Sequence, residues 1–138
     1  MNRARLRDQL VRHEGLRLKP YRDTVGKLTI GVGRNLDDVG LTEEEAYDLL
    51  SNDVDRTERS LRSAVPCFGS LDDARQRVLA DMAFNLGVTG LLQFKKMLAA
   101  VEARDFDLAA SEMLGSAWAG QVKGRAETLA RMMKRGED

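Results

Sequence analysis

The sequence predicts an α+β protein, mostly helical, in which a small β-hairpin lobe is joined by a long helix to a helical lobe. Two observations support this class. Apolar residues recur at helical spacing over most of the chain, whereas between Leu16 and Gly33 they alternate with small or charged residues, as in β-strands. The 138 residues suffice for one domain with an apolar core. We therefore assign residues 1–138 to a single domain, with the β lobe at about 15–40, the inter-lobe helix at about 42–65, and the helical lobe at about 66–138 with helix 3–13.

The N-terminal elements are predicted from a change of period. A short helix over 3–13 has apolar residues at helical spacing and is ended by Gly15. The next segment reads as strand, turn and strand, with the turn at 25–27. Gly31 and Gly33 leave one strand face bare, so that another group can approach the backbone closely. We expect the first helix to pack with the helical lobe.

The remainder of the chain is predicted to be helical. Thr42 and Glu45 form a capping box at the start of the long helix, which runs until Pro66. Ser70 and Asp73 predict a second helix start of the same kind, followed by a central buried helix. After Gly87 ends that helix, shorter helices are expected at about 91–101, 106–114 and 122–135. The methionines at 82, 97, 113, 132 and 133 fall at core spacings.

Composition excludes several classes of protein. Lys and Arg number 22, as do Asp and Glu, and this balance argues against a nucleic-acid binder. Cys67 is the single cysteine, so no internal disulfide forms, and we expect it to be a half-buried apolar residue. No apolar run is long enough to span a membrane, and no secretory signal is present, so synthesis in the cytosol is expected. No set of Cys and His residues has metal-ligand spacing.

Three polar side chains near the start of the chain form a compact set for acid/base chemistry. Glu14 stands at a helix C-terminus, where the negative end of the helix dipole favours the protonated carboxyl group. Asp23 lies in the polar hairpin, where we expect it to stay ionised, and Thr29 projects from the bare strand face, where its hydroxyl would hold a water molecule. An acid and a base are what metal-free glycoside hydrolysis requires. A hydrolase without a cofactor is therefore the leading hypothesis.

The sequence resembles the phage-type lysozymes, glycoside hydrolase family 24. The resemblance rests first on Glu14-Gly15-Leu16-Arg17-Leu18, Tyr21-Arg22-Asp23 and Gly26-Lys27-Leu28-Thr29-Ile30-Gly31-Val32-Gly33. It implies a lysozyme-like fold and cleavage of the β-1,4 bond between N-acetylmuramic acid and N-acetylglucosamine in peptidoglycan. It also implies that Glu14 is the general acid, while Asp23 and Thr29 position a water that attacks with inversion.

The resemblance extends to the rest of the chain with two departures. It implies that five residues bind substrate: Phe84, Asn85, Trp118, Gln121 and Arg125. Arg125 is further expected to reach Glu14. Arg34 stands where the family often has His, and our hypothesis is that it pairs with Asp53. The segment 35–42 is shorter than in the largest members, which trims the small lobe.

The biological setting is predicted from the same resemblance. We expect a monomeric phage or prophage endolysin that waits in the host cytoplasm, depends on a holin for export, and acts on peptidoglycan glycan strands in the cell wall or periplasm. It would neither bind nucleic acid nor insert stably into a membrane. A lytic transglycosylase acting on the same bond, a non-catalytic wall-binding module and a toxin-derived domain remain the alternatives.

Overall fold

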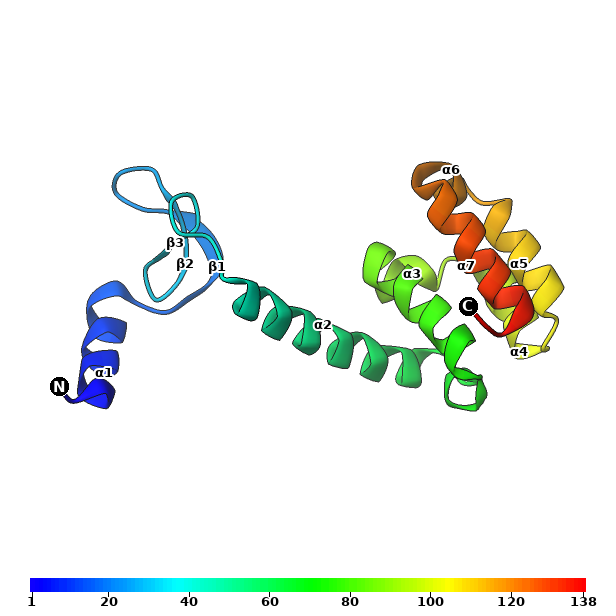
Figure 1. Ribbon diagram of the computed structural model, residues 1–138, viewed down its shortest axis with the longest axis horizontal. Helices are drawn as coiled ribbons and strands as arrows, with labels where there is room; N and C mark the ends of the chain where they lie inside the picture. The colour runs from blue at the N-terminus through cyan, green and yellow to red at the C-terminus, as the bar shows by residue number, and fades with distance from the viewer. The chain divides into compact units, whose positions relative to one another are not determined.

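The computed structural model describes residues 1–138 and divides into two compact units, Met1–Leu49 and Leu50–Asp138 (Figure 1). The first unit contains helix α1 (Arg3–Glu14) and strands β1 (Arg17–Arg22), β2 (Leu28–Gly31) and β3 (Arg34–Asn35). Helix α2 (Glu43–Ala64) begins in the first unit and continues into the second. The second unit also contains the 3-10 helix η1 (Phe68–Ser70) and helices α3 (Asp73–Leu91), α4 (Lys95–Glu102), α5 (Phe106–Leu114), α6 (Ala117–Val122) and α7 (Gly124–Arg135). The predicted α+β class is confirmed.

Helix α1 has defined caps at both ends. The Asn2 side chain accepts a hydrogen bond from the Arg5 amide, and the Gly15 amide donates to the Val11 carbonyl. The helix therefore ends where the sequence predicts, with Glu14 as its last residue. No residue of α1 is buried, and its packing against the helical lobe stays a prediction.

The sheet is antiparallel with strand order β1-β2-β3. Tyr21 is paired with Thr29, and Thr29 in turn with Asn35. The register of β1 shifts between Arg17 and Tyr21, around Pro20, which lacks the amide that a regular ladder uses. The first two strands match the predicted hairpin. Strand β3 was not predicted because two residues are too few for a periodic pattern.

The capping box of α2 is confirmed. The Glu45 amide donates to the Thr42 hydroxyl, and the Thr42 amide donates back to the Glu45 carboxylate, each over 3.1 Å. Arg34 adds an ion pair to the same carboxylate at 3.0 Å. Together these contacts lower the pKa of Glu45 to about 2, with the Arg34 hydrogen bond as the largest cause and the Thr42 bonds next.

The apolar core lies in the second unit, where every buried apolar side chain falls between Leu61 and Met133. Helix α3 is a buried helix as predicted, and the five predicted core methionines are all buried. The buried residues of α3 are Ala74, Val78, Leu79, Met82, Ala83 and Leu91. Gly87 has non-helical backbone angles (φ 75°, ψ 156°), so the central helix is interrupted there as expected. Cys67 is half-buried against this core, and burial is the main cause that raises the pKa of its thiol to about 11.

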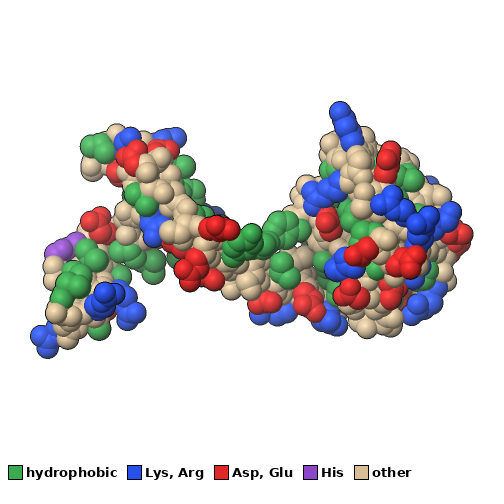
Figure 2. All heavy atoms as spheres, viewed as in Figure 1, with side chains coloured by type: hydrophobic (Ala, Val, Ile, Leu, Met, Phe, Trp, Pro, Cys, Tyr) green, Lys and Arg blue, Asp and Glu red, His purple; other side chains and the backbone are tan.

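The helical lobe differs from the prediction in three places, of which the first is α4, which begins at Lys95 rather than at about 91. Asp72, rather than Ser70, caps α3 by accepting from the Arg75 amide, because Ser70 belongs to η1 and its hydroxyl donates to the Cys67 carbonyl. Helix α6 lies in a segment that was expected to be a linker. Its cap is Ser116, whose side chain accepts from the Ala119 amide. Figure 2 shows acidic and basic side chains interspersed over the visible face of the second unit.

Candidate active site

Glu14 is presented at the end of α1 toward the loop that follows β2. The end of its side chain lies against the α-carbon of Gly33: a β-carbon placed there would be 3.0 Å from the Glu14 Oε2 atom. Within the first unit, the Glu14 carboxyl group makes no ion pair and no side-chain hydrogen bond. It is therefore free to exchange a proton or to contact a ligand.

Asp23 is held by the backbone of its own hairpin. Its Oδ1 atom accepts hydrogen bonds from the amides of Val25 (3.0 Å) and Lys27 (2.8 Å). The Asp23 amide donates to the Lys27 carbonyl, and the Gly26 amide donates to the Asp23 carbonyl, so the turn closes around this residue. Both side-chain bonds use Oδ1, which leaves Oδ2 available to another donor.

Thr29 is 3% exposed and is the one buried polar residue of the chain. Its hydroxyl donates to the Lys27 carbonyl over 2.9 Å. Because its proton is used in this bond, the hydroxyl oxygen interacts with any further group as an acceptor. The peptide groups of Lys27 thus fix both Asp23 and Thr29, and the hairpin holds a carboxylate and a hydroxyl in one rigid arrangement.

The Lys27 side chain extends from this hairpin to the loop after β3. Its ammonium group pairs with Asp38 at 3.1 Å, and this hydrogen bond is the largest cause that raises the pKa of Lys27. Nearby, the Asp37 carboxylate accepts from the Leu28 amide at 2.8 Å. These two bonds tie the loop to the turn that carries Asp23.

Two of the predicted substrate-binding residues contact each other in the second unit. The Trp118 indole N–H donates to the Asn85 side-chain carbonyl over 3.0 Å, and the Trp118 ring packs edge-on against Phe94. Trp118 is only 4% exposed, so its ring belongs to the core. Gln121 is exposed on α6.

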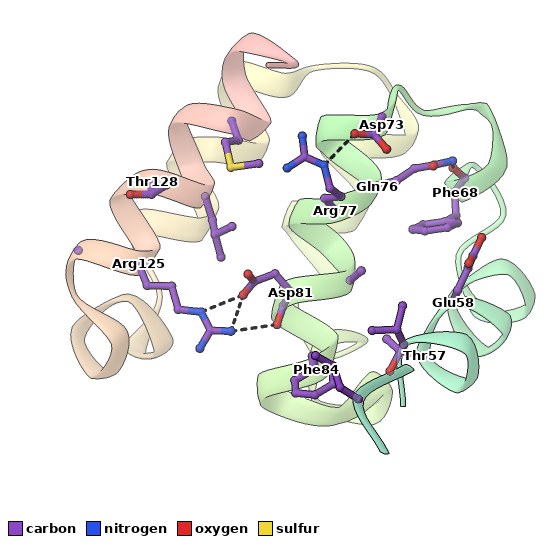
Figure 3. A pocket seen from close by; sticks show the side chains of 16 residues that line it. Thr57, Glu58, Phe68, Asp73, Gln76, Arg77, Asp81, Phe84, Arg125 and Thr128 are labelled. Carbon is purple, nitrogen blue, oxygen red and sulfur yellow. Dashed lines mark hydrogen bonds and ion pairs between the residues drawn. The ribbon is translucent and has the colours of Figure 1, made fainter. Parts of the chain in front are cut away.

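The other two predicted substrate-binding residues line a groove of about 770 Å³ in the second unit (Figure 3). Phe84, which is 51% exposed, lies at one end, and Arg125 extends from α7 toward α3. The apolar side chains that line it include Phe68 and Leu129. Asn85 and Trp118 do not line this groove.

Arg34 and Asp53 each have a partner of opposite charge within their own unit. Arg34 pairs with Glu45 and also donates to the Gly40 carbonyl, while Asp53 pairs with Arg56 one turn along α2. The hypothesised Arg34–Asp53 pair would join the two units and stays a prediction.

Arg125 pairs with Asp81, the distance from Nε to Oδ1 being 2.8 Å (Figure 3). Its predicted contact with Glu14 would join the two units and stays a prediction.

Sequence reasoning missed two features of these sites. One is the contact between Glu14 and Gly33; its signal was present in the alternate glycines, which indicated a close approach without identifying the approaching group. The other is the Asp81–Arg125 pair, which crosses from α3 to α7. Residues 44 positions apart in the sequence give no local pattern, so no signal could have found this pair.

Comparison with known proteins places the chain in a family. Residues 11–137 match the family model described as phage lysozyme. The chain is 32% identical, over 94% of its length, to the pre-baseplate central spike protein of Enterobacteria phage T4, although it spans only 27% of that protein. It is 27% identical to a probable T4-type lysozyme of Dictyostelium discoideum, covering 94% of that protein. It is 28% identical to an endolysin of Acyrthosiphon pisum secondary endosymbiont phage 1, covering 84% of that protein.

The enzyme class follows from the extent of the family match. A chain that matches the family model over nearly its whole length, with the expected α+β fold, has the class of that family. The chain belongs to the phage lysozyme family, and its class is that of the lysozymes, which are glycoside hydrolases. No helix of the structure is both long and apolar enough to cross a membrane.

Proposed function

We propose that the protein is a muramidase that hydrolyses the β-1,4 bond between N-acetylmuramic acid and N-acetylglucosamine in bacterial peptidoglycan. The observation that carries the proposal is the arrangement of the first unit in a phage lysozyme family chain: Glu14 ends α1 against the hairpin that fixes Asp23 and Thr29. The relatives named lysozyme and endolysin support the same substrate.

In the proposed mechanism Glu14 is the general acid that protonates the leaving oxygen. Within the first unit its carboxyl group makes no ion pair and no side-chain hydrogen bond, so it can contact the leaving oxygen.

Asp23 and Thr29 would position the attacking water. The two backbone amides on Oδ1 hold the Asp23 side chain in place, and Oδ2 remains to accept a proton from water. The Thr29 oxygen accepts a second hydrogen bond from that water, since its own proton is given to Lys27. Attack from the face opposite Glu14 gives inversion, for which the two carboxyl groups need a separation of about 6.5–9.5 Å in the working enzyme.

The proposal includes a binding surface in the second unit. Phe84 and Arg125 in the groove, with Asn85 and Gln121, would contact the glycan or its peptide. The exposed ring of Phe84 supports this role, because an aromatic face packs on a sugar ring. The burial of Trp118 restricts its part to holding Asn85 in place.

The biological setting is also proposed. As an endolysin, the monomeric protein would wait in the host cytoplasm, pass a holin-dependent pore and reach the wall or periplasm. The name of the aphid-endosymbiont phage relative supports this setting. A second setting is favoured by the 32% identity to a central spike protein: the chain would then act as the lysozyme part of a phage structural protein.

The test compares the native protein with Glu14→Gln on outer-membrane-permeabilised Gram-negative cells, by turbidity and by mass spectrometry of released muropeptides. We expect Glu14→Gln to lower the rate about 10²–10⁴-fold. Glu137→Gln, at an exposed position without a partner, is the matched control and should keep the native rate. Products heavier by one water than anhydro forms establish hydrolysis. Anhydro products would instead indicate a transglycosylase, and wall binding without lysis a non-catalytic module.

A further inference from the structure

We propose that Gly33 is a positioning residue for the Glu14 carboxyl group. Because Gly33 has no side chain, the Glu14 carboxyl group can occupy the position that a β-carbon would block. The inference rests on the proposed role of Glu14 and adds a residue that acts through it. A β-carbon on Gly33 would lie 3.0 Å from Oε2, 3.1 Å from Cδ and 3.2 Å from Cγ of Glu14. Three consecutive atoms of the Glu14 side chain therefore lie close to the position that a β-carbon of Gly33 would occupy.

An added methyl group would displace the acid rather than the strand. Gly33 lies between β2 and β3, and the next residue, Arg34, is paired with Ile30 in the sheet. Arg34 is also bonded to Gly40 and Glu45. Glu14, in contrast, is exposed, and within the first unit no hydrogen bond or ion pair holds its carboxyl group. The free end of a flexible side chain moves more easily than a backbone fixed on both sides.

The chain provides a matched control for the backbone effect. Gly33 and Gly31 both have positive φ, at +67° and +70°, so alanine is similarly strained at either position. A β-carbon on Gly31, however, meets no atom within 4 Å. The difference between Gly33→Ala and Gly31→Ala therefore isolates the contact with Glu14 from the strain of the turn.

The experiment measures kcat and KM for both variants on soluble, uncrosslinked glycan strands, together with the ¹³C resonance of the Glu14 carboxyl carbon. We expect Gly33→Ala to lower kcat about 10- to 100-fold with KM within about twofold, since displacement by a fraction of an ångström misaligns the acid. The Glu14 resonance should move in Gly33→Ala alone. Gly31→Ala should retain the native kcat and the native resonance, although it unfolds at a lower temperature.

Several results would overturn the inference. An equal loss of kcat in both variants would mean that strain alone is responsible. An unmoved Glu14 resonance in Gly33→Ala would refute the contact whatever the activity, and a moved resonance with native kcat would refute the positioning role. If the alanine variants fold poorly, Gly33→Asn and Gly31→Asn repeat the comparison, because asparagine adopts positive φ more readily. Full activity in Glu14→Gln would refute the proposed function separately, while the resonance still tests the contact.

Discussion

Asp23 has two separable tasks, because the hairpin backbone uses one of its carboxylate oxygens and the proposed chemistry uses the other. Oδ1 accepts from the amides of Val25 and Lys27, which closes the turn. An asparagine side chain also has an Oδ1 acceptor in this position but carries no charge and cannot take a proton from water. Substitution by asparagine or alanine therefore distinguishes the structural task from the catalytic one.

We predict that Asp23→Asn keeps the hairpin and loses activity, whereas Asp23→Ala loses both. Amide hydrogen exchange at Val25 and Lys27 should stay near native in the asparagine variant and accelerate in the alanine variant, where the acceptor is gone. Muropeptide release should fall about 10²-fold or more in both. Native activity in Asp23→Asn would limit Asp23 to a structural role in the turn.

The positions of the candidate site residues of the first unit could be predicted from the sequence, whereas most of their contacts could not. A carboxyl group at a helix end and a polar hairpin both leave local patterns, and the caps of α1 agree with them. The partners of arginine side chains, in contrast, leave no local pattern in the sequence. The chain offers 22 acidic residues to its long, flexible arginine side chains, so the choice of Glu45 by Arg34 and of Asp81 by Arg125 was settled only by the structure.

At the scale of elements, the N-terminus of α2 is held by a network that depends on charge. Arg34 and Thr42 both bind the Glu45 carboxylate, and they lower its pKa from 4.5 to about 2. A carboxyl group whose pKa is lower in the folded state adds stability above its unfolded pKa. That contribution disappears as protonation becomes complete in the folded state. The contribution of Glu45 should therefore be nearly full above about pH 4.5 and mostly lost by about pH 2.

We predict that Glu45→Gln reduces the pH dependence of stability in this range. Glutamine keeps the capping acceptor but forms no ion pair with Arg34, so the variant should melt below the native protein at pH 6 and approach it near pH 2. Thermal unfolding followed by circular dichroism from pH 2 to 6 measures the difference. Glu44→Gln, which alters the exposed neighbour in the same first turn, is the control. Parallel curves for native protein and Glu45→Gln would contradict the prediction.

The elements that the sequence failed to predict are those whose stabilising contacts lie outside their own segment. Helix α6 carries Gly120 in its interior and follows Gly115, so its composition resembles a linker. It is stabilised by the burial of Trp118 and by its bond to Asn85 on α3. Helix α5, in contrast, has an aspartate cap and spans the predicted residues.

At the scale of the molecule, packing and proposed chemistry are divided between the two units. Every buried apolar side chain lies between Leu61 and Met133, whereas Thr29 is the one buried residue before that range. Arg75 adds a polar link to the core: it stacks on Phe106 at 3.5 Å and donates to the carbonyls of Met133 and Lys134 at the end of α7. The second unit thus has the features of an independently stable fold.

We predict that residues 43–138 fold alone and that residues 1–49 do not. The longer fragment keeps α2 with all of the buried apolar side chains, which provide most of the free energy of folding. The shorter fragment has a three-stranded sheet that buries no apolar side chain, and such a sheet is only marginally stable in water.

Circular dichroism should show cooperative thermal unfolding for 43–138 and none for 1–49. The fluorescence of Trp118, the single tryptophan, should report a buried indole in the longer fragment. A non-cooperative melt of 43–138 with solvent-exposed Trp118 fluorescence would show that the helical unit requires the first unit in order to fold.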